Sequence, residues 1–108
     1  MLNNTQLAKR WGVPASTFYR YKRDRPVFFA LVVQGAEKNF ADDIQYPFLK
    51  PDELEMECNK RGFTLTELAE KSFIAKNSVK NWMTDPIRVK RFWDLLTGYH
   101  LEILARVQ

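Results

Sequence analysis

Cysteine and histidine are nearly absent from this sequence, which holds one of each, Cys58 and His100. A single cysteine excludes an internal disulfide and fits a reducing cytoplasm. A zinc site or a nucleophilic catalytic triad needs more histidines or cysteines than the chain contains. We therefore expect no metal, no cofactor and no enzymatic activity.

Long apolar runs are also missing. The longest, residues 27–33, has seven residues, whereas a membrane-crossing helix needs about 20. Residues 1–11 lack the apolar core of a signal peptide. With 45% hydrophobic and 14% aromatic residues among 108, the composition is that of a folded chain with no membrane partner.

The net charge of +4 is unevenly distributed along the chain. Residues 1–26 hold six basic and one acidic side chain, residues 27–58 two basic and seven acidic, and residues 59–108 nine basic and five acidic. Two basic segments therefore flank an acidic one. This pattern indicates two surfaces that face a polyanion and a spacer that avoids it; ordinary solvated surface is the alternative.

The chain repeats itself at an offset of 61 residues. Residues 5–22, TQLAKRWGVPASTFYRYK, align without a gap on residues 66–83, TELAEKSFIAKNSVKNWM. Three positions are identical, namely Thr5, Leu7 and Ala8 with Thr66, Leu68 and Ala69, and most apolar positions match in kind. The two segments also start alike, since Asn3 and Thr64 are good N-caps with Gln6 and Glu67 three residues on.

The first copy reads as two short helices joined by a glycine turn. Leu7 and Trp11 share one helical face, and Gly12 suits the left-handed turn that ends a helix. Phe18 and Tyr21 are three apart, so they share the inward face of a second helix. A helix, a turn and a helix is the helix-turn-helix layout.

This layout resembles the helix-turn-helix superfamily of DNA-binding proteins. Residues 51–98, which include PDELEMECNKRGFTLTELAEKS, are similar to the lambda-repressor/Cro type, with Pro51 at a helix start, Gly62 as its stop and the form T-x-x-E-L-A over residues 64–69. Residues 3–35 resemble a second, shorter unit without a leading helix, in the style of short phage-type regulators and excisionases.

The second copy departs from the family at its turn. Phe73 stands where glycine is usual, and Ser72 where an apolar residue is usual. A positive φ at Phe73 would cost about 1 kcal/mol or more. We therefore expect either another turn geometry or a displaced second helix.

The predicted fold is all-α, with two helix-turn-helix units in tandem joined by an acidic connector. The expected division is an N-terminal unit over residues 1–35, a connector over 36–50, and a lambda-repressor-like unit with C-terminal helices over 51–108. Helices are predicted at residues 4–11, 15–23, 26–34, 51–61, 65–72, 76–83, 86–97 and 99–106. Gly35 and Gly98 are expected to end helices, and Asp85 to cap one before Pro86.

The resemblance implies which residues would touch DNA, because the start of the second helix enters the major groove. The expected base-contacting residues are Ala15, Ser16, Thr17, Tyr19, Arg20, Lys76, Asn77, Ser78 and Asn81. The expected phosphate-contacting residues are Asn4, Thr5, Lys22, Arg23, Thr66, Lys80 and Arg88. The alternatives are that Tyr19 is a partly buried aromatic and that Arg20 pairs only with Asp24.

The resemblance implies a sequence-specific transcriptional regulator, such as a repressor of phage or mobile-element type, in the cytoplasm of a bacterium or of a phage-infected host. Its partner would be double-stranded DNA, and no small-molecule ligand is evident. The alternatives are a DNA-architecture protein, such as an excisionase or small packaging subunit, and a protein-binding inhibitor on a helix-turn-helix scaffold. Leu101, Leu104 and Val107 lie on one helical stripe and suggest a homodimer contact; packing within the chain is the alternative.

Overall fold

The computed structural model describes residues 2–42 and 45–106, and every regular element among them is a helix. The elements are α1 (Asn4–Arg10), α2 (Ala15–Asp24), α3 (Pro26–Asp42), α4 (Pro51–Asn59), α5 (Leu65–Lys71), α6 (Lys76–Asn81), the 3-10 turn η1 (Trp82–Thr84) and α7 (Arg88–Arg106). The predicted all-α class is confirmed, and the apolar run at residues 27–33 is helical, as predicted.

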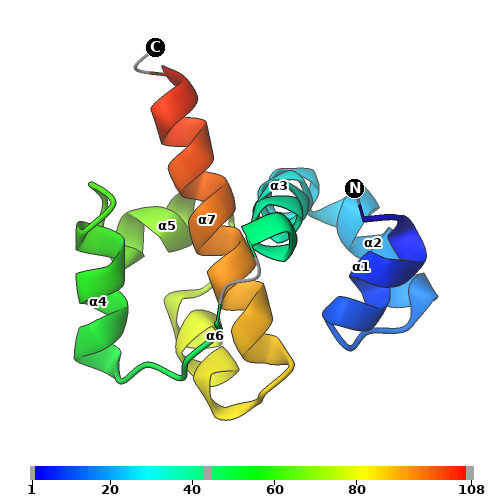
Figure 1. The fold of residues 1–108 in the computed structure, drawn as a ribbon, viewed down its shortest axis with the longest axis horizontal. Helices are drawn as coiled ribbons and strands as arrows, with labels where there is room; N and C mark the ends of the chain where they lie inside the picture. Colours follow the sequence, from blue (N-terminus) through cyan, green and yellow to red (C-terminus); the bar gives the residue numbers. More distant parts are fainter. Residues whose placement is uncertain (1, 43–44, 107–108) are drawn as a thin grey trace.

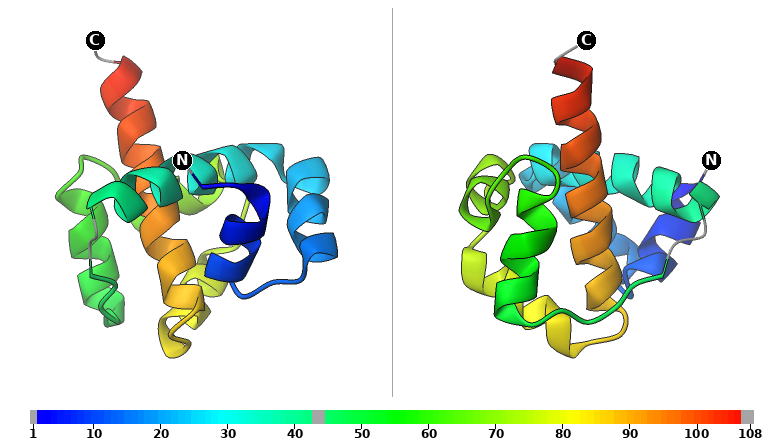
Figure 2. Two further views of the ribbon diagram at one scale, coloured as in Figure 1. Left: turned by 45° about the vertical axis from the view of Figure 1, so that its right-hand side comes forward. Right: turned by 60° about the vertical axis from the view of Figure 1, so that its left-hand side comes forward.

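The two longest helices, α3 and α7, cross at the centre of the molecule. Figure 1 shows α7 running through the middle, and the two views of Figure 2 show α3 lying across it. A Cβ atom built on Gly35 would lie 1.6 Å from the carbonyl oxygen of Asp94, and one on Gly98 would lie 1.8 Å from that of Leu31. The crossing therefore brings backbone against backbone, and only glycine fits at these two positions.

Two sequence predictions are wrong for this reason. Gly98 does not end a helix, because α7 continues through it to Arg106, and α3 continues through Gly35 to Asp42 rather than stopping at residue 34. The first part of the predicted connector, residues 36–42, is thus helical. Glycine in a helix interior costs about 0.5–1 kcal/mol, and here the close approach of the two helices offsets that cost.

The helix pair α1/α2 lies on one side of this crossing and the pair α5/α6 on the other (Figure 1). The helix α4 lies beside α5 and has no equivalent in the first half. Each half therefore consists of a short helix, a turn, a second helix and a long helix, and the two long helices hold the halves together.

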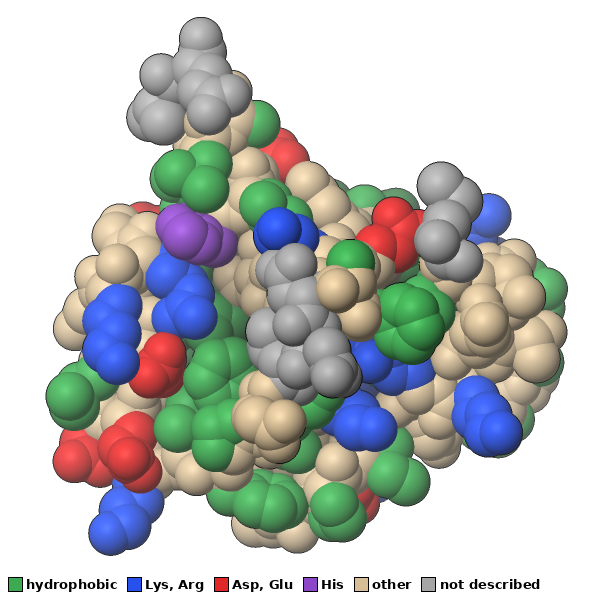
Figure 3. All heavy atoms as spheres, in the orientation of Figure 1, with side chains coloured by type: hydrophobic (Ala, Val, Ile, Leu, Met, Phe, Trp, Pro, Cys, Tyr) green, Lys and Arg blue, Asp and Glu red, His purple; other side chains and the backbone are tan. Residues whose placement is uncertain are grey.

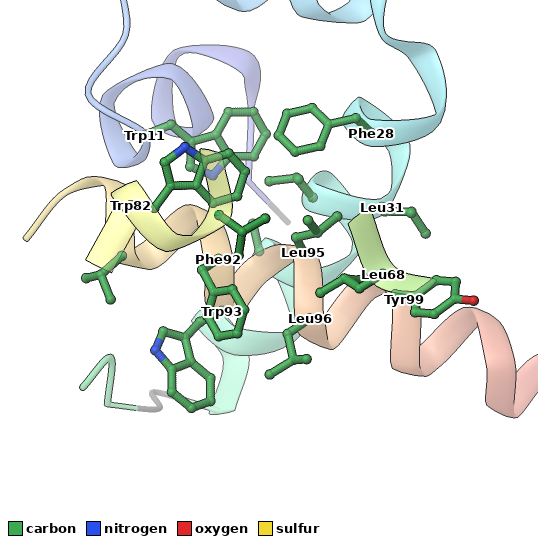
Figure 4. Close-up of a cluster of buried hydrophobic side chains, with 14 of the residues drawn as sticks. Trp11, Phe28, Leu31, Leu68, Trp82, Phe92, Trp93, Leu95, Leu96 and Tyr99 are labelled. Carbon is green, nitrogen blue, oxygen red and sulfur yellow. The ribbon is translucent and has the colours of Figure 1, made fainter. Parts of the chain in front are cut away.

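One hydrophobic core connects the two halves. It includes Trp11 and Phe28 from the first half and Trp82 and Phe92 from the second, which Figure 4 shows gathered around the crossing. The rings of Phe28 and Trp82 lie 6.0 Å apart between centroids. A unit of about 50 residues would be only marginally stable alone, and the shared core makes the two halves more stable together.

A buried carboxylate fastens the first half to α7. Asp94 is fully buried, and its oxygens accept hydrogen bonds from Arg10 Nε and Nη2 at 2.9 Å, from Trp11 Nε1 at 3.0 Å and from Asn39 Nδ2 at 3.1 Å. Arg10 also donates to the Tyr46 hydroxyl. Burial by itself would lower the pKa of Arg10, but the hydrogen bonds and charge of Asp94 hold that pKa above its ordinary value.

The ends of α7 differ from the sequence prediction in detail. The helix begins at Arg88 rather than residue 86, and Asp85 caps it, since its Oδ1 accepts from the backbone N–H of Ile87 at 2.7 Å and of Arg88 at 3.1 Å. At the other end the last turns project from the body (Figure 2). Of the predicted dimer contacts, Leu101 is half-buried, Leu104 is exposed and Val107 lies outside the described residues.

Within residues 2–42 and 45–106, no helix is long and apolar enough to cross a membrane. The same residues contain no group of three or more His, Cys, Asp or Glu side chains arranged to hold a metal ion.

The crossing predicts a strong effect of one methyl group. Gly98→Ala should lower the free energy of unfolding by about 3 kcal/mol or more, because the new Cβ would meet the Leu31 carbonyl and overpacking of backbone cannot relax through a rotamer. Urea denaturation measures the change. Gln34→Ala, at an exposed position of α3, is the matched control and should stay within about 0.5 kcal/mol of wild type. Equal stability of the two variants would contradict the proposed constraint.

The buried ion pair predicts non-additive substitutions. Asp94→Leu alone leaves Arg10 without its charge partner, and Arg10→Met alone leaves the buried Asp94 carboxylate unpaired. Each should cost about 3–5 kcal/mol in unfolding free energy. The double variant should lose less than the sum of the two, as measured by a double-mutant cycle in urea. Strict additivity would show that the pair contributes no coupling.

Candidate nucleic-acid interface

The two helix pairs turn with the same backbone conformation. The residue that ends α1, Trp11, has φ −91° and ψ 1°, and its counterpart Ser72 at the end of α5 has φ −93° and ψ −4°. The next residues both have positive φ, 64° at Gly12 and 59° at Phe73. The expectation of another geometry or a displaced second helix at Phe73 is therefore wrong.

The backbone hydrogen bonds of the two turns also match at the 61-residue offset. In the first turn, the N–H of Gly12 donates to the Lys9 carbonyl at 3.1 Å and that of Val13 to the Ala8 carbonyl at 3.1 Å. In the second, the N–H of Phe73 donates to the Glu70 carbonyl at 3.2 Å and that of Ile74 to the Ala69 carbonyl at 3.0 Å. The two turns thus have the same backbone geometry despite their different sequences.

The helix starts follow the predicted caps. The Asn3 side chain accepts from the Gln6 N–H at 2.8 Å, and the Gln6 side chain accepts from the Asn3 N–H at 2.9 Å, which completes a capping box. Thr64 caps α5 by accepting from the Glu67 N–H at 3.0 Å. These bonds satisfy N–H groups that the first turn of a helix leaves without partners.

The outward face of α2 is polar and basic. Phe18 is buried, while Ser16, Tyr19, Arg20 and Arg23 are exposed at the i, i+3, i+4 and i+7 positions of one stripe. Tyr19 is 53% exposed and its ring lies edge-on to that of Phe18, with 5.8 Å between centroids, so it is partly buried, as the alternative prediction has it, and partly open to solvent. This face offers a guanidinium, a phenol and a hydroxyl to solvent.

Arg20 is not the ion-pair partner of Asp24. The Asp24 carboxylate instead accepts from Arg23 Nε at 2.9 Å, and that hydrogen bond lowers the pKa of Asp24. The alternative prediction, in which Arg20 pairs with Asp24 at i+4, is therefore wrong. The Arg20 side chain is exposed on the stripe that the sequence predicted for base contacts.

The equivalent face of the second pair carries amides and a lysine. Asn77, Lys80, Asn81 and Thr84 are exposed at positions that correspond to the α2 stripe by the 61-residue offset. Thr84 continues the face beyond α6, where η1 keeps the chain coiled and the Thr84 hydroxyl donates to the Asn81 carbonyl at 2.8 Å. The sequence prediction missed Thr84, although the 61-residue offset, extended by one position beyond the aligned segments, pairs it with Arg23.

Two residues of the second pair that were predicted to contact DNA, Lys76 and Thr66, interact instead within the protein. Lys76 Nζ donates to the Thr66 hydroxyl at 3.1 Å and forms an ion pair with Glu55 of α4 at 3.4 Å. Lys76 is half-buried as a result. The polar face available on α6 therefore starts at Asn77.

The remaining predicted residues are distributed around these two faces. Thr17 and Ser78 are half-buried at equivalent positions of α2 and α6. The other predicted residues are exposed: Asn4, Thr5, Ala15, Lys22 and Arg88. Asn4 and Thr5 line a shallow hollow with Ala15 and Tyr19, where the start of α1 meets the start of α2. The structure thus brings two predicted phosphate contacts, Asn4 and Thr5, beside two predicted base contacts, Ala15 and Tyr19.

The charged surface of the fold corresponds only in part to the basic, acidic and basic segments of the sequence. On the face seen in Figure 3, acidic side chains gather near the start of α4, while Lys and Arg side chains are spread over the rest. The first turn of α4 contains Asp52 and Glu53. The acidic character of the middle segment is therefore concentrated at α4 on this face.

Comparison with known proteins gives no family for this chain: no family model, no curated protein and no solved structure matches it.

The strained turn predicts a stabilising substitution. Phe73 has a positive φ and is 73% exposed, so Phe73→Gly should raise the free energy of unfolding by about 0.5–1 kcal/mol as the strain is released, less the greater freedom of glycine in the unfolded chain. Gly12→Ala is the matched control and should lower it, since its Cβ would meet Ile87 Cγ2 at 2.5 Å. Thermal and urea unfolding give both values. A loss of stability in Phe73→Gly would mean that its side chain contributes more than the strain costs.

Proposed function

We propose that this chain is a non-enzymatic, sequence-specific DNA-binding regulator that uses α1/α2 and α5/α6 as two helix-turn-helix units in tandem. One observation carries the proposal. Two turns with the same dihedral angles and hydrogen bonds are each followed by a helix that exposes polar side chains on one stripe. In helix-turn-helix proteins this stripe of the second helix enters the major groove.

The chemistry of the α2 face suits base edges and phosphates. A guanidinium can bind guanine O6 and N7 with two hydrogen bonds, a contact worth about 1–3 kcal/mol of discrimination, and Arg20 is the exposed guanidinium for this role. Lys22, Arg23 and the polar side chains of Asn4 and Thr5 would contact phosphates, which position the protein on the duplex.

The α6 face suits a different base. Asn77 and Asn81 are exposed one helical turn apart, and an asparagine amide pairs with adenine N6 and N7. Lys80 would contact phosphate or guanine. We therefore propose a site whose two parts differ in sequence.

The proposal is tested by selecting binding sites from a random pool of double-stranded DNA. Wild type should enrich one sequence, Arg20→Ala should relax it at one set of base pairs and Asn77→Ala at another, each by about 5- to 150-fold in discrimination, which corresponds to 1–3 kcal/mol. Arg106→Ala, at the exposed end of α7, should select the wild-type sequence. Affinity should fall steeply with salt as counterions are released.

Further measurements on the same protein distinguish the alternative functions, a DNA-architecture protein and a protein-binding inhibitor. A strong bend in permuted-site mobility would assign an architectural role rather than simple regulation. If no sequence is enriched and binding shows no salt dependence, the DNA-binding proposal fails. Capture of one stoichiometric protein partner without DNA binding would then favour the inhibitor.

A further inference from the structure

A polar cavity lies where the two halves meet, at the start of α7. It holds about 300 Å³, which leaves room for a phosphate group and several waters, since a water takes about 30 Å³ of liquid volume. Trp11 and Tyr21 line it from the first half, and Trp82, Asp85, Arg88 and Arg91 from the second. A ligand in this cavity would therefore contact the α1–α2 pair on one side and η1 and the start of α7 on the other.

The most unusual side chain in this cavity is Arg91. It is only 8% exposed, its Nη2 donates to the Trp11 carbonyl at 3.3 Å, and its Nε has no hydrogen-bond partner. Its guanidinium lies 5.8 Å from the ring centroid of Tyr21 and 5.4 Å from that of Trp82. Among the described residues no carboxylate lies within ion-pair distance of it.

Arg91 therefore differs from the other buried arginine. The Arg10 guanidinium is paired with Asp94 by two hydrogen bonds, whereas burial lowers the pKa of the unpaired Arg91. A buried charge without a counter-charge is costly, and buried N–H groups are nearly always satisfied. An anion in the cavity would satisfy both requirements.

The first turn of α7 carries further positive charge against the usual rule. Arg88, Lys90 and Arg91 lie in that turn, which contains no acidic residue, although the helix dipole disfavours cations at a helix start. Asp85 is the one carboxylate among the residues that line the cavity. Its Oδ1 accepts from two backbone N–H groups, and its Oδ2 forms a long ion pair with Arg88 Nε at 4.0 Å. Arg88 precedes Arg91 by three residues, so the two share a helical face.

We propose that this cavity binds a phosphate group, with Arg91 donating from inside and Arg88 from the rim. Arginine is the side chain best matched to phosphate, because its planar fork donates two parallel hydrogen bonds. The phosphate belongs either to a free phosphate or phosphorylated small molecule, or to the DNA backbone; only the second source rests on the proposed function. In both cases the anion ties the α1–α2 turn to the start of α7.

The first arm of the test uses inorganic phosphate alone. Isothermal titration of the full chain should show phosphate binding above a chloride control at equal ionic strength. Arg91→Gln and Arg88→Gln should each weaken it by at least tenfold, and Arg106→Gln should not change it. Because Arg88 is largely exposed, with 57% of its side chain accessible, Arg88→Gln keeps the test valid if Arg91→Gln fails to fold.

The second arm uses duplex DNA of the selected sequence and of scrambled sequence. If phosphate alone does not bind, but Arg88→Gln weakens binding to both duplexes equally and lowers the salt slope by about 1, the cavity takes a backbone phosphate. If wild type shows no phosphate binding and Arg88→Gln binds both duplexes like Arg106→Gln, the cavity proposal is overturned. If the chain binds inorganic phosphate but binds neither duplex, the proposed function is overturned and the cavity proposal stands.

Discussion

The structure depends on one residue, Asp94, which joins the two halves through both its backbone and its side chain. Its carbonyl oxygen lies where α7 meets Gly35, and its carboxylate accepts from Arg10, Trp11 and Asn39. The backbone contact sets how closely α3 and α7 approach, and the carboxylate fixes where α1 lies against α7. A fully satisfied buried network of this kind specifies one arrangement, because any other would leave a charge buried and unpaired.

The comparison of Gly12 with Phe73 shows that the repeat is conserved in backbone more than in sequence. Intrinsic preference favours glycine at a positive φ, and Phe73 adopts φ 59° nonetheless. A residue stays strained only where its surroundings determine the backbone more strongly. Here the surroundings are Val79, Leu68 and Ala69, which are all buried and hold α5 and α6 at the angle that the turn must span.

The local features of the fold could be predicted from the sequence, and the long-range ones could not. The caps at Asn3 and Thr64, the turn at Gly12 and the inward Phe18 follow from spacing over a few residues. Gly98 could not be interpreted correctly, since glycine serves both to end a helix and to let another helix approach. The choice between these two uses depends on Leu31, 67 positions away in the chain.

In the candidate site, too, the local features could be predicted from the sequence and the long-range contacts could not. The 61-residue offset places the exposed stripes of α2 and α6 and would also have located Thr84. Nothing local indicates that Lys76 is held by Glu55, or that Arg91 lies between Tyr21 and Trp82. These contacts join different elements of the fold, so neither the repeat nor a local motif predicts them.

The two proposed units are unequal for a physical reason that lies outside their turns. The second helix of the first unit, α2, has ten residues. Its counterpart in the second unit, α6, has six residues, and its first residue, Lys76, forms an ion pair with α4. The extra helix α4 therefore supports α5/α6 at the expense of one cation that would otherwise face solvent. Arg91 contacts the aromatic residues Tyr21 and Trp82, which are themselves equivalent by the repeat. The start of α7 therefore contacts equivalent residues of both proposed units through one side chain, while Asp94, farther along the same helix, holds the two halves of the fold together.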